Sequence, residues 1–165
     1  MKRNIKKTLL VIALLPILWY LHHIFESNNA MQSLIGCNRN LRQIGREVSL
    51  YMEDWNDTFP PAKTWQVSII SRFPKDKRNS VFICPSSPQK YGYFFNVKCD
   101  HLLLSDVPNP SSKILLYEQN SIKTNGYGDG NTLPPLYRHF SRSNFLHVDG
   151  HVSSVSIASK SKLSW

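Results

Sequence analysis

Residues 8–55 read TLLVIALLPILWYLHHIFESNNAMQSLIGCNRNLRQIGREVSLYMEDW. The first part of this segment, residues 8–25, is predominantly apolar over about 18 residues, the lower limit for a helix that spans a membrane. A signal peptidase site needs small residues, and Asn28 occupies the third-last position before the best candidate cut, after Ala30. The sequence therefore favours a transmembrane anchor or uncleaved signal at residues 8–25 over a cleaved signal peptide, which stays the alternative.

The charges around this apolar segment predict its orientation. Four basic residues, Lys2, Arg3, Lys6 and Lys7, precede it and none lies within it. Positive charge is retained on the cytoplasmic side. We therefore expect residues 1–7 to be a cytoplasmic basic leader and residues 26–165 to be an exported domain. The protein would be a single-pass membrane protein that contacts lipid through residues 8–25, with its C-terminal domain periplasmic or extracellular.

The second part of the segment has the pattern of an amphipathic helix over residues 28–55. Apolar side chains recur every three or four positions: Met31, Leu34, Ile35, Leu41, Ile44, Val48, Tyr51 and Trp55. Because no glycine or proline falls between Ile17 and Ile35, we predict one continuous helix from Lys7 to Trp55. Pro16 is the position where a kink is expected. Gly36 and Gly45 should weaken the helix only slightly.

The remaining chain predicts shorter elements. Thr64 to Phe73 reads as a helix with Thr64 as its N-cap. Segments rich in Val, Ile, Tyr and Phe, bounded by turn residues, read as strands at 81–84, 91–97, 113–119 and in the closing part of the chain. After the anchor, about 140 residues remain, which is enough for one domain. The predicted fold class is α+β.

Asp149 and Gly150 separate two β-rich runs and predict a hairpin. A two-residue type I′ turn would place both residues at positive φ. In that register His147 faces Val152, Leu146 faces Ser153, and His147 and His151 lie on opposite faces of the sheet. A metal or acid–base site built from His139, His147, Asp149 and His151 is then disfavoured, because the two hairpin histidines cannot share an ion.

Charge and cysteine content limit the partners and the compartment. The formal net charge is +9, but four of the 20 basic residues precede the anchor, which leaves 16 basic against 11 acidic residues in the exported part. This excess is modest, so we expect no nucleic-acid binding. Cys37, Cys84 and Cys99 allow one disulfide and one spare thiol in an oxidising compartment, with three pairings open.

Candidate sites for calcium and for catalysis are weak. The loop from Gly126 to Asn131 is rich in glycine, but Asp129 is its one carboxylate, and Ca²⁺ requires six to eight oxygen ligands. We expect a plain turn there and no cofactor. No Gly-x-Ser-x-Gly elbow occurs in the sequence, so the sequence does not predict an enzyme.

Four motifs together resemble a known family. They are Cys37 to Gly45 with Asn40 and Leu41, followed by Tyr51, Asp54 and Pro60-Pro61; Phe82 to Ser86 with Cys84 and Pro85; Tyr91-Gly92-Tyr93; and His139 with nine residues before Asp149-Gly150-His151. In this order they resemble the bacterial pseudopilin-like proteins with a prepilin-type N-terminus and a C-terminal His-(nine residues)-Asp-Gly motif. The resemblance covers most of residues 31–158.

The resemblance implies a pilin-like fold: a long N-terminal helix, half membrane-spanning and half amphipathic, packed on a small antiparallel sheet. It also implies a Cys37–Cys84 disulfide, since both cysteines lie in family motifs and Cys99 does not. Residues Ile5 to Val11 lack the glycine and the glutamate of a prepilin peptidase site, so the site is degenerate and the resemblance does not extend to processing.

On this basis we expect a non-enzymatic, membrane-anchored structural or assembly protein of the bacterial cell envelope, related to type II secretion. Its partners would be lipid and other pilin-like or secretion-system proteins. The alternative is an exported module, tethered by the anchor, that binds a ligand or metal. We also expect His139 to bond near the hairpin turn, and Gly150→Ala to destabilise the domain more than His139→Ala.

Overall fold

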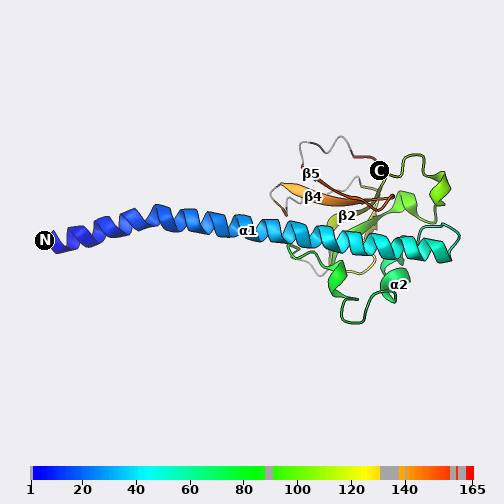
Figure 1. Ribbon diagram of the computed structural model, residues 1–165, viewed down its shortest axis with the longest axis horizontal. Coiled ribbons are helices and arrows are strands. Elements are labelled where there is room, and N and C mark those ends of the chain that lie inside the picture. Colours follow the sequence, from blue (N-terminus) through cyan, green and yellow to red (C-terminus); the bar gives the residue numbers. More distant parts are fainter. Residues whose placement is uncertain (1, 88–90, 131–137, 140, 157–158, 160–162) are drawn as a thin grey trace.

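A computed structural model shows a long helix with a small α+β head at its C-terminal half (Figure 1). It describes residues 2–87, 91–130, 138–139, 141–156, 159 and 163–165, without the side chains of residues 2–13. Helix α1 runs without a break from Lys2 to Asp54, through Pro16. The predicted continuity of the helix is therefore confirmed. Asn56 and Asp57, both at positive φ, end it.

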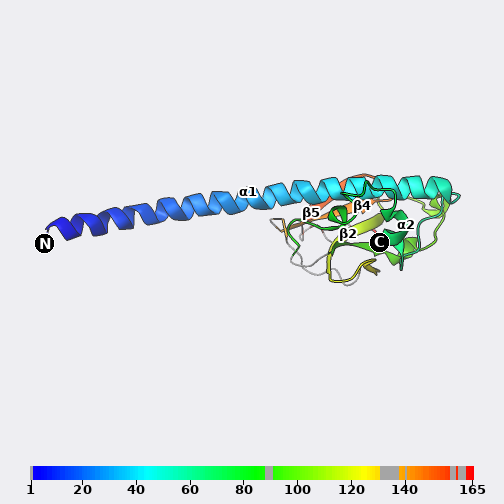
Figure 2. The same cartoon turned by 90° about the horizontal axis from the view of Figure 1, so that it is seen from below.

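The two halves of α1 have different surroundings. Its N-terminal half projects from the head, whereas its C-terminal half lies along one face of the sheet (Figures 1 and 2). Cys37, Leu41, Ile44 and Val48 point into the core, at the spacing of one helix face. Met31, which belongs to the apolar pattern of the predicted helix, is 49% exposed and does not join the core. Among residues with described side chains, no helix has the length and hydropathy needed to cross a membrane.

The head is built on a five-stranded sheet with the order β3-β1-β2-β4-β5. The strands are β1 (Tyr91–Asn96), β2 (Ile114–Ser121), β3 (Tyr127–Gly128), β4 (Arg142–His147) and β5 (Val152–Ser156). Three pairs are antiparallel, but β1 and β3 run parallel. The sheet is therefore mixed, and the expectation of an antiparallel sheet is wrong at β3, which follows β2 after a turn and returns to the outer edge of β1.

Short helices fill the connections. Helix α2 spans Trp65–Ile70, and 3-10 turns occupy Ser80–Phe82 (η1), Val97–Cys99 (η2) and Leu104–Asp106 (η3). The predicted strand at residues 81–84 is wrong, because Val81 and Phe82 bury their side chains from η1 instead. Thr64 stands at the N-cap of α2 as predicted, but its side chain makes no capping hydrogen bond.

Two glycines let α1 approach the head closely. A Cβ on Gly45 would lie 2.9 Å from Leu146 Cδ1, and one on Gly36 would lie 3.2 Å from Pro85 Cγ. The apolar core between α1 and the sheet includes Leu41, Ile44 and Trp65. A second cluster on the sheet contains Ile114, Tyr117 and Phe145, packed against Trp165. Glycine therefore serves helix packing here, a role that helix propensity alone did not indicate.

Candidate functional site

A buried carboxylate lies at the centre of the head. Strand β2 places Glu118 between β1 and β4, where the residue is 2% exposed. Its carboxylate accepts hydrogen bonds from Asn144 N at 3.0 Å and from Asn144 Nδ2 at 2.9 Å. His139 Nε2 lies 3.1 Å from Glu118 Oε1. Burial of a carboxylate is costly unless it is paired and hydrogen-bonded, and these contacts meet that requirement.

His139 links this carboxylate to the disulfide. Its side chain is fully buried. Its Nε2 lies 3.6 Å from Cys84 Sγ, and its Nδ1 lies 3.4 Å from Ser86 Oγ. The expectation that His139 bonds near the hairpin turn is wrong. The nine residues between His139 and Asp149 are taken up largely by strand β4, so the histidine lies at the opposite end of that strand from the turn.

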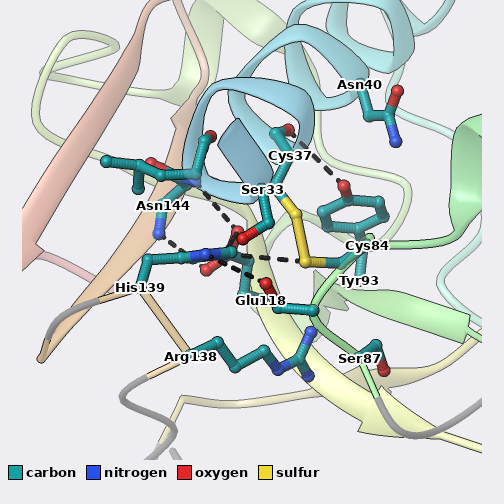
Figure 3. A network of polar contacts seen from close by, with 12 residues as sticks. Ser33, Cys37, Asn40, Cys84, Ser87, Tyr93, Glu118, Arg138, His139 and Asn144 are labelled. Atoms are coloured by element: carbon teal, nitrogen blue, oxygen red, sulfur yellow. Dashed lines mark hydrogen bonds and ion pairs between the residues drawn. A yellow bond between two sulfur atoms is a disulfide. The ribbon is translucent and has the colours of Figure 1, made fainter. Parts of the chain in front are cut away.

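Arg138 adds a positive charge next to this group. Burial lowers the pKa of its guanidinium, and the negative charge of Glu118 opposes that effect. Nη2 of Arg138 donates a hydrogen bond to Asn120 Oδ1. Figure 3 shows His139 and Glu118 beside the disulfide, with Arg138 below them. The cluster is therefore a charged, hydrogen-bonded interior rather than an apolar core.

The disulfide Cys37–Cys84 joins α1 to the head, with Cα atoms 5.2 Å apart. This is the pairing that the resemblance predicted. Asn40 Nδ2 donates to Ile83 O at 2.9 Å beside it, and Tyr93 Oη donates to Cys37 O at 3.4 Å. Cys99 keeps a free, buried thiol, and burial raises its pKa to about 11.

These contacts give most of the motif residues a structural role in joining α1 to the head. Leu41 is fully buried between α1 and the head. Pro85 packs against Gly36. Asn40 holds the chain that carries Cys84. The first two motifs therefore meet in space as one joint between helix and head.

The hairpin differs from its predicted geometry. Gly150 has φ +88° but Asp149 does not have positive φ. Gly150 N donates to His147 O at 2.9 Å, and His147 N donates to His151 O at 2.9 Å. This is a three-residue loop that ends in a left-handed glycine, the next most common hairpin connection after the two-residue turn. The type I′ prediction is wrong, and Leu146 pairs with Val152 instead of Ser153.

The changed register brings the two hairpin histidines together. The rings of His147 and His151 stack with centroids 4.1 Å apart, although alternation had predicted opposite faces. Asp149 Oδ1 lies 2.6 Å from His151 Nδ1. Burial lowers the pKa of His147, and the positive charge of His151 adds to that effect. Three residues of the disfavoured candidate site therefore lie together at the hairpin, with His147 buried and Asp149 and His151 exposed, and His139 does not join them.

The glycine-rich segment contains strand β3 (Tyr127–Gly128), so the expectation of a plain turn is wrong at these two residues. Gly126 O accepts hydrogen bonds from Trp65 Nε1 and from Phe95 N, both at 2.9 Å. Gly130 has φ +82°, and a Cβ there would lie 2.1 Å from the Trp165 ring. These contacts account for the glycines at both positions. Asp129 belongs to the same loop, and Asn131 of the calcium alternative lies outside the described residues.

Sequence reasoning missed Glu118 and Asn144. One signal was present: Glu118 interrupts the apolar run Ile114-Leu115-Leu116-Tyr117 in a predicted strand, and a charge in a buried strand requires a partner. The side chains of His139 and Glu118 are 0% and 1% exposed.

Comparison of the chain with protein-family models, with curated proteins and with solved structures gives no match. Function is therefore inferred from the sequence and the geometry of this chain.

Proposed function

We propose that this chain is a non-enzymatic, membrane-anchored, pseudopilin-like structural or assembly protein of the bacterial cell envelope, related to type II secretion. One observation carries the proposal: the N-terminal half of α1 stands clear of the head (Figure 1), and apolar side chains between Leu14 and Phe25 are exposed. Leu14, Leu18, Trp19 and Phe25 are between 44% and 68% exposed. Apolar area of this extent requires a non-aqueous partner.

Lipid is the partner that fits residues 8–25. The segment carries no charged residue, follows four basic ones, and includes Trp19 and Tyr20, residue types enriched at membrane interfaces. The head then lies on the far side of the membrane. The Cys37–Cys84 disulfide supports this placement, since such bonds persist in exported compartments.

A rigid connection between the anchor and the head supports a structural role. Because α1 is continuous and the disulfide fixes it to the head, a force or displacement at one end is transmitted to the other. An assembly protein of the envelope needs this property. A tethered binding module does not, because a flexible linker would be sufficient for it.

The test is membrane insertion and topology of the full chain in a bacterial host. We expect it to remain in membranes after alkaline extraction, with the head digested by protease added to the outer side. Leu14→Arg combined with Leu18→Arg should release the chain into the soluble fraction. Gln43→Arg, on the exposed side of the packed half of α1, is the matched control and should stay in membranes. A wild-type chain extracted by alkali, or a head facing the cytoplasm, would contradict the proposal.

A second candidate function is favoured by the hairpin. His147, Asp149 and His151 lie together near the surface, which suits an exported module that binds a metal. Elemental analysis of the purified full chain, compared with His151→Ala, tests it. Metal that is present in the wild type and lost in the variant would favour the binding module.

A further inference from the structure

Four side chains with metal-ligating atoms converge beneath α1. They are Cys37, Cys84, Glu118 and His139, and their ligand atoms all lie within 4.8 Å of one another. They come from α1, from the segment after η1, from β2 and from the chain before β4. Figure 3 shows all four side chains pointing to one place. Two cysteines, a histidine and a carboxylate form a donor set that suits Zn²⁺.

We propose that reduction of the Cys37–Cys84 disulfide converts this cluster into a tetrahedral Zn²⁺ site with Cys37, Cys84, His139 and Glu118 as ligands. The proposal does not depend on the function proposed above. The disulfide and the metal exclude each other, because two zinc-bound sulfurs lie roughly 3.8 Å apart and cannot remain bonded. The cluster therefore has two alternative states, oxidised or metal-bound.

Reduction of the Cys37–Cys84 disulfide uses a phosphine or a dithiol as the reductant. The reductant supplies two electrons, the sulfur–sulfur bond breaks, and each cysteine gains a proton as a thiol. A phosphine is oxidised to its oxide with oxygen from water, and a dithiol to its own disulfide. Zinc binding then releases both thiol protons, because the thiolate is the ligand. The imidazole binds in its neutral form through Nε2 and the carboxylate binds in its ionised form.

The present distances already approach those of a tetrahedral site. Ligand atoms around zinc lie roughly 3.3 to 3.8 Å apart, given metal–ligand bonds of about 2.0 to 2.3 Å. His139 Nε2 is 3.1 Å from Glu118 Oε1 and 3.6 Å from Cys84 Sγ. These two pairs need little movement, and release of the sulfur–sulfur bond permits the two sulfurs to separate to roughly 3.8 Å.

The surroundings supply the outer contacts that metal ligands need. Ser86 Oγ lies 3.4 Å from His139 Nδ1 and can accept a hydrogen bond from the Nδ1–H group when Nε2 binds metal. Asn144 donates two hydrogen bonds to the Glu118 carboxylate. Such contacts orient ligands and tune the metal. Two thiolates and a carboxylate leave one net negative charge with Zn²⁺, and the nearby positive charge of Arg138 offsets it.

A groove provides a route to the buried atoms. It has a volume of about 460 Å³ and lies between residues 29–33 of α1 and the segment with Pro85, Ser86 and Arg138. Ser86 contacts His139, and Arg138 precedes it in the chain. A bound metal would keep α1 attached to the head when the disulfide is reduced.

The experiment uses the full chain in a non-ionic detergent. The chain is reduced with tris(carboxyethyl)phosphine, which is then removed without oxygen, and Co²⁺ is added as a spectroscopic probe. We expect one Co²⁺ per reduced chain, with thiolate-to-metal charge-transfer absorption and the intense visible bands of tetrahedral Co²⁺, and loss of these bands when Zn²⁺ is added. The oxidised chain should show neither absorption. A reduced chain without charge-transfer bands, folded or unfolded, would overturn the proposal.

Matched variants identify the ligands. Glu118→Gln and His139→Gln are first shown by circular dichroism to be folded in their oxidised forms. After reduction, each should bind Co²⁺ at least about 10-fold more weakly than the wild type. Cys99→Ser and His151→Ala test the other thiol and the hairpin, and should bind as the wild type does. Unchanged binding by either glutamine variant would remove that residue from the site, and loss of binding in either control would overturn the assignment.

Discussion

The two ends of the His139-to-Gly150 motif have opposite environments. His139 is enclosed beside Glu118 and the disulfide, whereas Asp149 and His151 lie on an exposed turn. The motif is contiguous in sequence, but β4 separates its ends in space. His139 is therefore part of the core, whereas His151 is part of the surface. The same residue type is expected to affect stability strongly at the buried end and weakly at the turn.

The difference follows from solvent access. A buried donor that loses its acceptor cannot form a hydrogen bond with water instead. The full free-energy cost of its desolvation therefore remains. An exposed pair such as Asp149 and His151 exchanges its partner for water at little cost. Variants at the two ends therefore test one physical rule.

Glu118→Ala should be the most damaging change. It leaves Asn144 N, Asn144 Nδ2 and His139 Nε2 without their shared acceptor, and each unsatisfied buried group costs about 1 to 3 kcal/mol. We expect a loss of about 4 kcal/mol or more in the free energy of unfolding, measured by denaturant titration of the full chain. Glu118→Gln keeps an acceptor and should lose less. Equal losses in the free energy of unfolding for both variants would show that the missing hydrogen-bond acceptor is not the cause of the destabilisation.

Replacing both Cys37 and Cys84 with serine should cost about 3 to 4 kcal/mol, since the bond closes a long loop. The sequence separation of the two cysteines is 47 residues. Reduction of the wild type without metal should give a similar loss, and Cys99→Ser, which breaks no disulfide, is the control. Thermal unfolding of the oxidised and reduced chains measures the effect. An unchanged midpoint in the double variant would mean that packing alone holds α1 to the head.

Sequence reasoning identified the elements that depend on local periodicity. The long helix, the strands around β1, β2, β4 and β5, and the α+β class follow from patterns of three to four residues or of two. The Cys37–Cys84 pairing came from the resemblance, because spacing alone allowed three pairings. The structure confirms these predictions because each feature is specified by many residues or by a motif.

What the sequence could not predict depends on tertiary contacts. The hairpin register differs from the predicted one because Gly150 occupies the left-handed position of a three-residue loop. This shift of one residue places His147 and His151 on the same face of the hairpin instead of opposite faces. The partners of Glu118 come from segments more than 20 residues away in sequence. No local pattern specifies such contacts, so the buried polar cluster was found only in the structure.

Gly150→Ala should cost about 1 kcal/mol, because a side chain at positive φ is strained. Among the described residues, no atom lies within 4 Å of a Cβ placed there, so no steric clash adds to the strain. His139→Ala should cost more, about 2 kcal/mol, from a lost buried hydrogen bond and a cavity. This order reverses the sequence-based expectation. Thermal unfolding of both variants measures it, with Gly150→Asn as a control that tolerates the left-handed conformation.

The smallest effect should be a pH dependence at the hairpin. The pKa of His147 is lowered from its ordinary value of 6.5 by burial and by the charge of His151. The folded chain therefore binds fewer protons than the unfolded chain below about pH 6.5, so this contribution to stability is complete above that pH and is lost as the pH falls toward the lowered pKa. His151→Ala removes one cause and should raise the pKa of His147 and reduce the loss. NMR titration of the His147 ring, with thermal unfolding between about pH 7.5 and 5, measures both, and His101→Ala is the control on another exposed loop. A His147 pKa at or above 6.5 in the wild type would contradict the lowering expected from burial and from the stacked His151.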